Sequence, residues 1–329
     1  MNLIKLFDSL SIPAKGISDA FNAVLIPDYP NFRIAVDSKG NSVLLLAVAD
    51  SQKSTRLKNI RLKHLQLVKD VNCKITENGE STSQTFTVIT FLNTDRNLQE
   101  YFLQISETLF KSLNEKPTQQ QVFETLRKFV EIFRALSDVP TNTAQGLWAE
   151  LFLIDIANDT KPVLSYWHNF PEETFDFNSG AEKIEVKSTS RFERIHTFSS
   201  EQLNPPVGSR LLIASIFVSQ SNTGKSVQDL VESITMKIGS KFELIEKLNT
   251  LVSKTLGNSF EQSIKIKFDY EMAENSLRFY SHQDIKKIEE IDIPTEVSAV
   301  KYKSDLSTIT SINLESLNKK KSLLNSFSL

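Results

Sequence analysis

The pattern of hydrophobic and polar residues predicts a β-rich first part of the chain. Apolar runs bounded by turn residues, or alternating with polar residues, are typical of strands. We expect strands at residues 31–37, 42–49, 56–68 and 85–92. Two helices should follow, because apolar residues recur every three or four positions over Leu98–Leu113 and again over Val122–Phe133. Pro140 ends this periodic stretch.

The second part of the chain alternates helices and strands. A helix should run from about Thr143 to Asn158, because Thr141 to Thr143 offer N-caps and the apolar residues after them have helical spacing. The continuous apolar run at 210–218 is typical of a central strand buried on both faces. Helices are also expected after Lys225 and at 241–256.

These elements predict an α/β fold, α+β overall, in which helices flank a mixed central sheet and a β-rich domain precedes it. At 329 residues the chain is long enough for two domains. The predicted regions are a β-rich N-terminal domain at 1–115, a helical connection at 116–140, a core at 141–257 and a C-terminal α/β extension at 258–329.

One segment, Asp176 to Lys187, combines carboxylates with a lysine. Alternation in Ile184-Glu185-Val186-Lys187 puts Glu185 and Lys187 on one face of a strand, and the turn residues at 178–180 predict a hairpin. Asp176 and Glu185 can then converge while Lys187 reaches an adjacent point, an arrangement that suits a divalent cation and a phosphate ester. The alternative is a solvated strand face, which a lone Glu-x-Lys usually marks.

A second carboxylate candidate is Glu150, on the predicted helix that begins near Thr143. Leu147, Leu151 and Ile154 form its apolar stripe, and Glu150 falls inside that stripe. A carboxylate on the core side of a helix is costly unless it is paired or bound to a metal. The alternative is an edge position that reaches solvent or pairs with an arginine.

Residues from about Thr143 to Val218 resemble the nuclease core of the PD-(D/E)XK superfamily. They resemble in particular the bacterial PD-(D/E)XK motif proteins encoded beside restriction and phage-defence genes. The matching stretches are GLWAELFL at 146–153, WH at 167–168, FDF at 175–177, IEVKST at 184–189 and RIHTFSSEQL at 194–203. The proline that usually precedes the aspartate is replaced by Phe175. The resemblance implies a restriction-endonuclease-like core.

The resemblance also implies a Mg²⁺-dependent DNA endonuclease of a restriction or anti-phage defence system, with Mn²⁺ as a substitute ion. Asp176 and Glu185 would ligate the metal together with the Val186 carbonyl. Glu150 would complete the site directly or through water, and Lys187 would orient the attacking water. These roles agree with the oxygen ligands and retained waters that Mg²⁺ prefers.

The segment after the Glu-x-Lys motif supplies candidates for positioning the substrate phosphate. These are Arg194, His196, Ser199 and Gln202. Arginine and hydroxyl groups beside a metal site suit phosphate contacts. The alternatives are an ion pair for Arg194, a structural hydrogen bond for His196 and a capping role for Gln202.

The formal charge of −2 gives the chain no overall attraction to nucleic acid, so DNA contacts must use local basic patches. Lys58, Arg61 and Lys63 form one such patch and are candidate DNA-backbone contacts. A solvated strand face is the alternative reading of this patch.

The numbers of cysteines and histidines exclude two kinds of site. The single cysteine, Cys73, excludes an internal disulfide, and four scattered histidines exclude a standard zinc cluster. No apolar run reaches membrane-spanning length and the first residues lack signal-peptide features, so we expect a cytoplasmic location and no membrane partner.

The expected partners are DNA and other restriction or defence subunits. These subunits could include a methyltransferase and an ATPase. Any nucleotide-hydrolysing motor would be a separate chain, since the sequence has no Gly-rich phosphate loop. A homodimer would provide two active sites for cutting both strands. The alternatives are a DNA-binding or scaffolding subunit whose nuclease is inactive alone or partner-gated, an RNA-cleaving enzyme, and a structural module.

Overall fold

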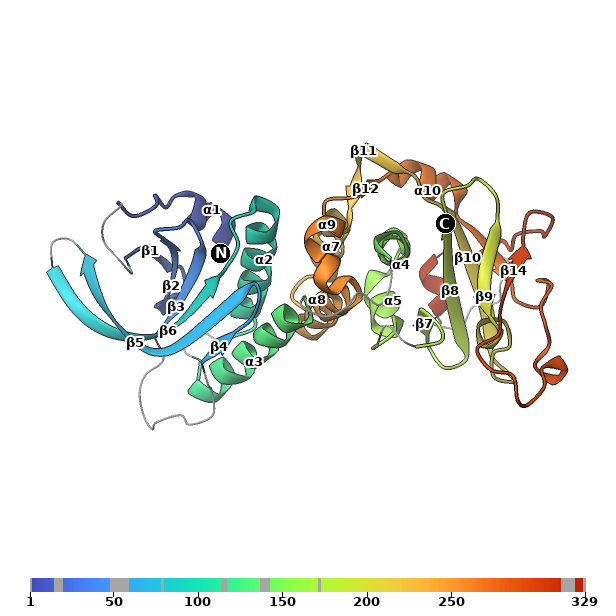
Figure 1. Cartoon of the computed structure of the whole chain (residues 1–329), viewed down its shortest axis with the longest axis horizontal. Coiled ribbons are helices and arrows are strands. Elements are labelled where there is room, and N and C mark those ends of the chain that lie inside the picture. The colour runs from blue at the N-terminus through green and yellow to red at the C-terminus, as the bar shows by residue number, and fades with distance from the viewer. Residues whose placement is uncertain are drawn as a thin grey trace. The chain divides into compact units, whose positions relative to one another are not determined.

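The structure is a computed structural model that divides into two compact units, Met1–Asp138 and Val139–Leu329 (Figure 1). We call them the N-terminal and the C-terminal unit. The structure describes residues 2–14, 20–47, 59–77, 80–113, 117–136, 143–170, 173–314 and 323–327. Lys58, one of the candidate DNA contacts, lies outside the described residues.

The N-terminal unit contains a six-stranded antiparallel sheet with the order β1-β2-β3-β6-β5-β4. Its strands are β1 Phe21–Ile26, β2 Tyr29–Asp37, β3 Ser42–Leu46, β4 Ile60–Arg61, β5 Leu65–Glu77 and β6 Glu80–Phe91. The prediction of one strand at 56–68 is wrong, because β4 ends at Arg61 and β5 begins at Leu65. We missed most of the long β5–β6 hairpin, whose polar residues hide the alternation, and its register shifts between Val68 and Val71.

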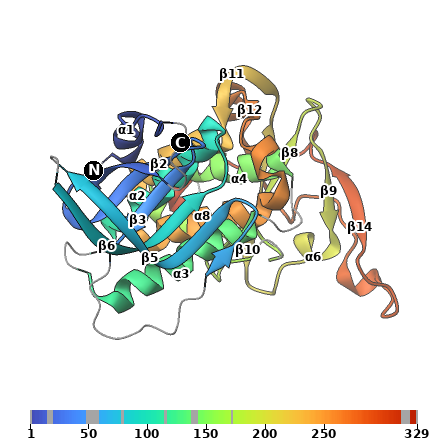
Figure 2. The ribbon, with the colours of Figure 1, turned by 60° about the vertical axis from the view of Figure 1, so that its left-hand side comes forward.

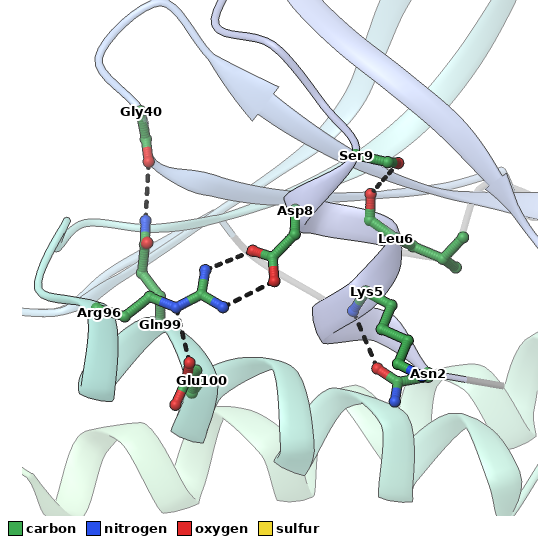
Figure 3. A network of polar contacts seen from close by, with 9 residues as sticks. All are labelled: Asn2, Lys5, Leu6, Asp8, Ser9, Gly40, Arg96, Gln99 and Glu100. Carbon is green, nitrogen blue, oxygen red and sulfur yellow. Dashed lines mark hydrogen bonds and ion pairs between the residues drawn. The ribbon is translucent and has the colours of Figure 1, made fainter.

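The helices beside this sheet, within the described residues, are α1 Leu3–Asp8, α2 Arg96–Lys111 and α3 Gln119–Ala135. Aromatic rings from β6, α2 and α3 meet in the core, with Phe102 5.0 Å from Phe91 and 5.8 Å from Phe133. Figure 3 shows a network around Arg96, which donates to Asp8 on α1 at 2.5 and 2.8 Å. This network is partly exposed, so it orients α1 against α2 more than it stabilises the fold.

The C-terminal unit is built on a mixed four-stranded sheet with the order β13-β10-β8-β7. Its strands are β7 Phe177–Asn178, β8 Glu182–Thr189, β10 Arg210–Phe217 and β13 Arg278–Ser281. β8 and β10 are parallel, and the edge strands are antiparallel to them. This sheet confirms the predicted fold class. β13 comes from the region that we predicted as a C-terminal extension, yet it forms one edge of the same sheet.

Helices and two smaller sheets surround the central sheet. The helices are α4 Ala144–Ile156, α5 Thr160–Tyr166, α6 Ser200–Leu203, α7 Val227–Ile238, α8 Phe242–Leu256, α9 Phe260–Ser263 and α10 Tyr270–Ser276, with 3-10 turns at Gly257–Ser259, Glu290–Asp292 and Leu323–Phe327. The two-stranded sheets pair β11 Gln220–Ser226 with β12 Lys267–Phe268, and β9 Ile195–Ser199 with β14 Lys301–Asp305. No helix in the described ranges is both long and apolar enough to cross a membrane.

Helix α4 is held in the core by its apolar surface and by one buried carboxylate. Its N-cap is Thr143, whose hydroxyl accepts the Gly146 N–H. Near its C-terminal end, Asp155 accepts hydrogen bonds from Ser233 at 2.6 Å, Tyr270 at 2.8 Å and Lys237 at 2.8 Å. Asp155 is 1% exposed. These contacts fix α4 against α7 and α10, and α4 carries Glu150.

Candidate active site

The β7–β8 hairpin brings Asp176 beside the middle of β8. Phe177 pairs with Ile184, and the turn between the strands contains Gly180 at φ 90, a conformation that favours glycine. Asp176 Oδ2 then accepts the Val186 N–H at 2.7 Å. The hairpin therefore fixes the aspartate next to the strand that carries the Glu-x-Lys motif.

On β8, Glu185 and Lys187 point to the same face and form an ion pair. Lys187 Nζ lies 2.8 Å from Glu185 Oε1, and Glu185 is 2% exposed. The Gln202 side chain bridges the pair: its amide nitrogen donates to Glu185 Oε1, and its oxygen accepts from Lys187 at 3.0 Å. Ser199 caps α6 and donates its N–H to the same Gln202 oxygen at 3.0 Å. The capping box thus holds Gln202 in place between the two motif residues.

Glu150 faces the same region from α4 and is 4% exposed. Its Oε2 accepts from Trp167 Nε1 at 2.8 Å and contacts His168 Nε2 at 3.1 Å. His168 Nδ1 lies 2.7 Å from the Phe170 carbonyl. Both ring nitrogens face acceptors, and only the doubly protonated imidazolium can donate to both. Burial alone lowers the pKa of His168, but the hydrogen bond and charge of Glu150 outweigh it and raise that pKa.

We had assigned no chemistry to the Trp167-His168 pair, and this is the part of the site that sequence reasoning missed. Two features of the sequence could have indicated this contact. Glu150 lies inside an apolar stripe and needs a partner, and Trp167 and His168 have ring N–H donors. Their connection requires the α4–α5 packing, which periodicity alone does not give.

The ionised forms of Asp176 and Glu185 are destabilised by their surroundings. Burial, followed by the charges of Glu185 and Glu150, raises the pKa of Asp176 well above its ordinary value. Burial also raises the pKa of Glu185, although Lys187 opposes the shift. A nearby cation would relieve both effects, because it favours the ionised carboxylates.

The donor atoms fit a hard divalent cation. Glu185 Oε2 is buried and has no hydrogen-bond partner in the described part of the chain, so it lacks the contact that a buried acceptor normally has. No group of three His, Cys, Asp or Glu side chains within the described ranges is arranged to hold an ion by itself. Asp176 and Glu185 are the carboxylates best placed to serve as donors, because Glu150 is already bonded to Trp167 and His168. Mg²⁺ suits such a pair, since it fills its other positions with carbonyls and water.

These groups open into one cavity of about 630 Å³. The predicted residues that line it are Glu150, Asp176, Glu185, Val186, Lys187, Ser199 and Gln202. Further lining residues include Glu173, Thr197, Glu201 and Lys301. The cavity thus joins the predicted catalytic and metal-binding residues with two of the four predicted phosphate contacts.

The structure does not bring Arg194 and His196 to this cavity. The Arg194 guanidinium donates to the Ser215 carbonyl at 2.9 Å and hydroxyl at 2.8 Å, and it stacks 4.5 Å from the Phe217 ring centre. His196 is 3% exposed, and its Nε2 lies 2.7 Å from the Ser215 hydroxyl. Burial and the charges of Lys187 and Arg194 lower its pKa to about 4, so the ring is neutral. His196 on β9 and Arg194 just before it therefore bond to β10 instead of lining the cavity.

Arg61 and Lys63 are exposed in the N-terminal unit. Arg61 lies on β4 and donates to the Gln66 side chain at 3.5 Å. Their role as DNA contacts stays a prediction.

A comparison of the sequence with models of protein families finds a match. The model of a family described as "Putative PD-(D/E)XK family member, (DUF4420)" matches residues 3–307. The chain belongs to this family. The match covers both units and confirms the resemblance found in the nuclease-like stretches. Membership in this PD-(D/E)XK family indicates a nuclease-like function. No curated protein and no solved structure matches the chain.

Proposed function

We propose that the chain is a Mg²⁺-dependent endonuclease that hydrolyses DNA phosphodiester bonds. One observation carries the proposal: Asp176 and Glu185 share a cavity with Lys187, and one Glu185 oxygen is buried there without a hydrogen-bond partner in the described part of the chain. The proposed setting is a restriction or anti-phage defence system. DNA would be its macromolecular partner there, with any methyltransferase or ATPase as a separate subunit.

In this proposal Asp176, Glu185 and the Val186 carbonyl hold the ion. When bound, Mg²⁺ supplies positive charge to the phosphate and lowers the pKa of a coordinated water. Gln202 keeps Lys187 next to Glu185. An ammonium has three N–H donors, and two of those of Lys187 go to Glu185 and Gln202. The third can hold the attacking water or a phosphate oxygen, and the charge offsets the negative charge that develops during the reaction.

The charges around the cavity support a requirement for metal. Its lining contains five carboxylates but two ammonium groups: Glu150, Glu173, Asp176, Glu185 and Glu201 against Lys187 and Lys301. Even without Asp176, whose ionisation burial opposes, the carboxylates outnumber the ammonium groups, so a phosphate diester entering these walls meets a negative potential. A divalent cation between Asp176 and Glu185 reverses the local sign, so substrate binding and cleavage should share one metal dependence.

The direct test incubates purified protein with labelled DNA, and in parallel with labelled RNA, in Mg²⁺, Mn²⁺ or chelator. Asp176→Ala and Lys187→Ala should reduce metal-dependent cutting of DNA by roughly 10³-fold or more. Asp159→Ala is the matched control, because Asp159 is exposed and its side chain makes no capping hydrogen bond.

Metal-dependent cutting that survives both site substitutions would refute the site assignment. Cutting of RNA alone would favour the RNA-cleaving alternative. If wild-type protein cuts nothing in any metal, the partner-gated or scaffolding alternative replaces the proposal.

A further inference from the structure

The strands β9 and β14 form a two-stranded ribbon, which we call the β9–β14 ribbon (Figure 2). Lys301 pairs with Ser199, and Lys303 pairs with Thr197. Directly opposed residues of an antiparallel pair point to the same face, and alternate residues share that face. The two lysines and the two hydroxyl side chains therefore lie on one outward face. The inward face is packed, since Phe198 is 0% exposed.

This outward face continues into the cavity that holds the proposed metal ligands. Thr197, Ser199 and Lys301 line the same cavity as Asp176 and Glu185. Lys303 lies two residues beyond Lys301, which is about 7 Å along a strand. Two nucleotides of one DNA strand rise by about the same distance along the helix axis. The ribbon thus leads away from the cavity with cations at a spacing suited to phosphates.

The two lysines are available for a ligand. Both are exposed, and neither ammonium group is hydrogen-bonded or within ion-pair distance of a carboxylate among the described residues, although the charge of Lys301 helps to lower the pKa of Glu201. Lys187, in contrast, is held by Glu185 and Gln202. Lys301 is therefore the described cavity-lining lysine whose ammonium has no hydrogen bond to another side chain, whereas Lys187 has one N–H left beside those held by Glu185 and Gln202.

We propose that the outward face of the β9–β14 ribbon binds the phosphate backbone of the DNA strand next to the scissile bond, through Lys301 and Lys303 with the Thr197 and Ser199 hydroxyls. This inference rests on the proposed nuclease function and extends it. It identifies where a chain with a formal charge of −2 obtains its affinity for a polyanion. Such contacts set the position of the strand without reading its sequence.

The test is the double variant Lys301→Gln/Lys303→Gln, compared with Lys241→Gln/Lys267→Gln. The control pair is also exposed and also lies in the C-terminal unit. DNA binding is measured by fluorescence anisotropy in Mg²⁺ over a salt series, with Lys187→Ala in every protein to suppress cutting. Each phosphate contact contributes about 0.9 to the salt slope on duplex DNA, so the ribbon variant should lose about 1.8. A loss of about 1.8 in the salt slope corresponds to a DNA affinity roughly 10- to 60-fold lower at 0.1 M salt.

Kinetics with Lys187 intact provide a second readout. Contacts that bind substrate and transition state equally raise KM without lowering kcat. We expect KM of the ribbon variant to rise roughly 10-fold or more with little change in kcat, and Lys303→Gln alone to remove about half of the slope change.

The possible results separate the two proposals. If wild-type protein cuts DNA but the ribbon variant keeps the slope and KM of the control pair, the ribbon assignment is wrong and the nuclease proposal stands. If wild-type protein neither binds nor cuts DNA in any metal, both fail. A fall in kcat at unchanged KM would also contradict a backbone-binding role.

Discussion

In the absence of metal, the buried carboxylates Asp176 and Glu185 should destabilise the folded protein. The Asp176→Asn variant tests this directly. The amide keeps an oxygen that can accept the Val186 N–H, now 2.7 Å from Asp176. It replaces a buried carboxyl group, whose ionisation burial and the charge of Glu185 oppose, with a neutral amide. In chelator, the substitution should therefore raise stability by about 0.5–2 kcal/mol, as relief of a destabilised active site commonly does. For a unit of this size that is a rise in Tm of roughly 1 to 8 °C.

The same substitution should abolish the effect of Mg²⁺. An ion that binds only the folded state at 100 times its Kd stabilises wild-type protein by about 2.7 kcal/mol. This corresponds to a rise in Tm of roughly 5 to 11 °C. Asp176→Asn should lose most of that rise, since it removes one of the two carboxylate ligands. Stability and metal response thus change in opposite directions, which general damage to the fold would not produce.

The assay is thermal unfolding followed by tryptophan fluorescence, with and without Mg²⁺. Both tryptophans, Trp148 and Trp167, are buried in the C-terminal unit, so the signal reports the unit that contains the site. Asp159→Asn serves as the control for losing an exposed aspartate. A lower Tm of Asp176→Asn in chelator, or an undiminished Mg²⁺ response, would refute the reasoning.

Three further predictions concern other parts of the C-terminal unit. Burial opposes ionisation of Asp155, but hydrogen bonds from Lys237 and other donors outweigh it and lower its pKa. The ionised Asp155 carboxylate therefore stabilises the fold above the unfolded-state pKa near 3.8, and this stabilisation is lost as pH falls through the lower folded-state pKa. Asp155→Asn should flatten the acid side of a plot of Tm against pH. An unchanged slope of that plot would contradict this prediction. Gln202→Leu should lower kcat by about 10- to 100-fold, the usual cost of losing a group that orients a ligand. An unchanged kcat in steady-state kinetics would show that the Gln202 bridge between Glu185 and Lys187 does not matter for the reaction. Chelation should weaken DNA binding by wild-type protein, because the acidic cavity repels phosphate when no cation is bound; equal anisotropy titrations with and without Mg²⁺ would exclude that mechanism.

The sequence was sufficient for the parts of the site that depend on local pattern. Alternation in β8 and the turn before it predicted the hairpin, and the stripe around Glu150 predicted an inward carboxylate. The apolar run at 210–218 predicted β10, which the structure places at 210–217. These features depend on neighbouring residues, so strand and helix periodicity is enough to find them.

Other features depend on contacts between distant segments. The Arg194 guanidinium looked available for a phosphate, but Ser215 and Phe217 on β10 occupy it. We assigned no role to Lys301 or Lys303 from the sequence, because nothing local shows that Lys301 pairs with Ser199. Such pairings follow from sheet topology, which a single sequence does not specify.

The pairing of β14 with β9 also has a consequence for biosynthesis. Gln202 completes the cluster around the Glu-x-Lys motif, but the strand that supplies Lys301 and Lys303 is translated about 100 residues later. At ordinary elongation rates this interval is roughly 5 to 20 seconds. During that time a nascent chain has its carboxylates but lacks the second strand of the ribbon, and until Ser281 is added it also lacks the β13 edge of the central sheet. If the ribbon binds DNA as proposed, a chain cut short before Lys301 would lack both lysines and should bind DNA more weakly.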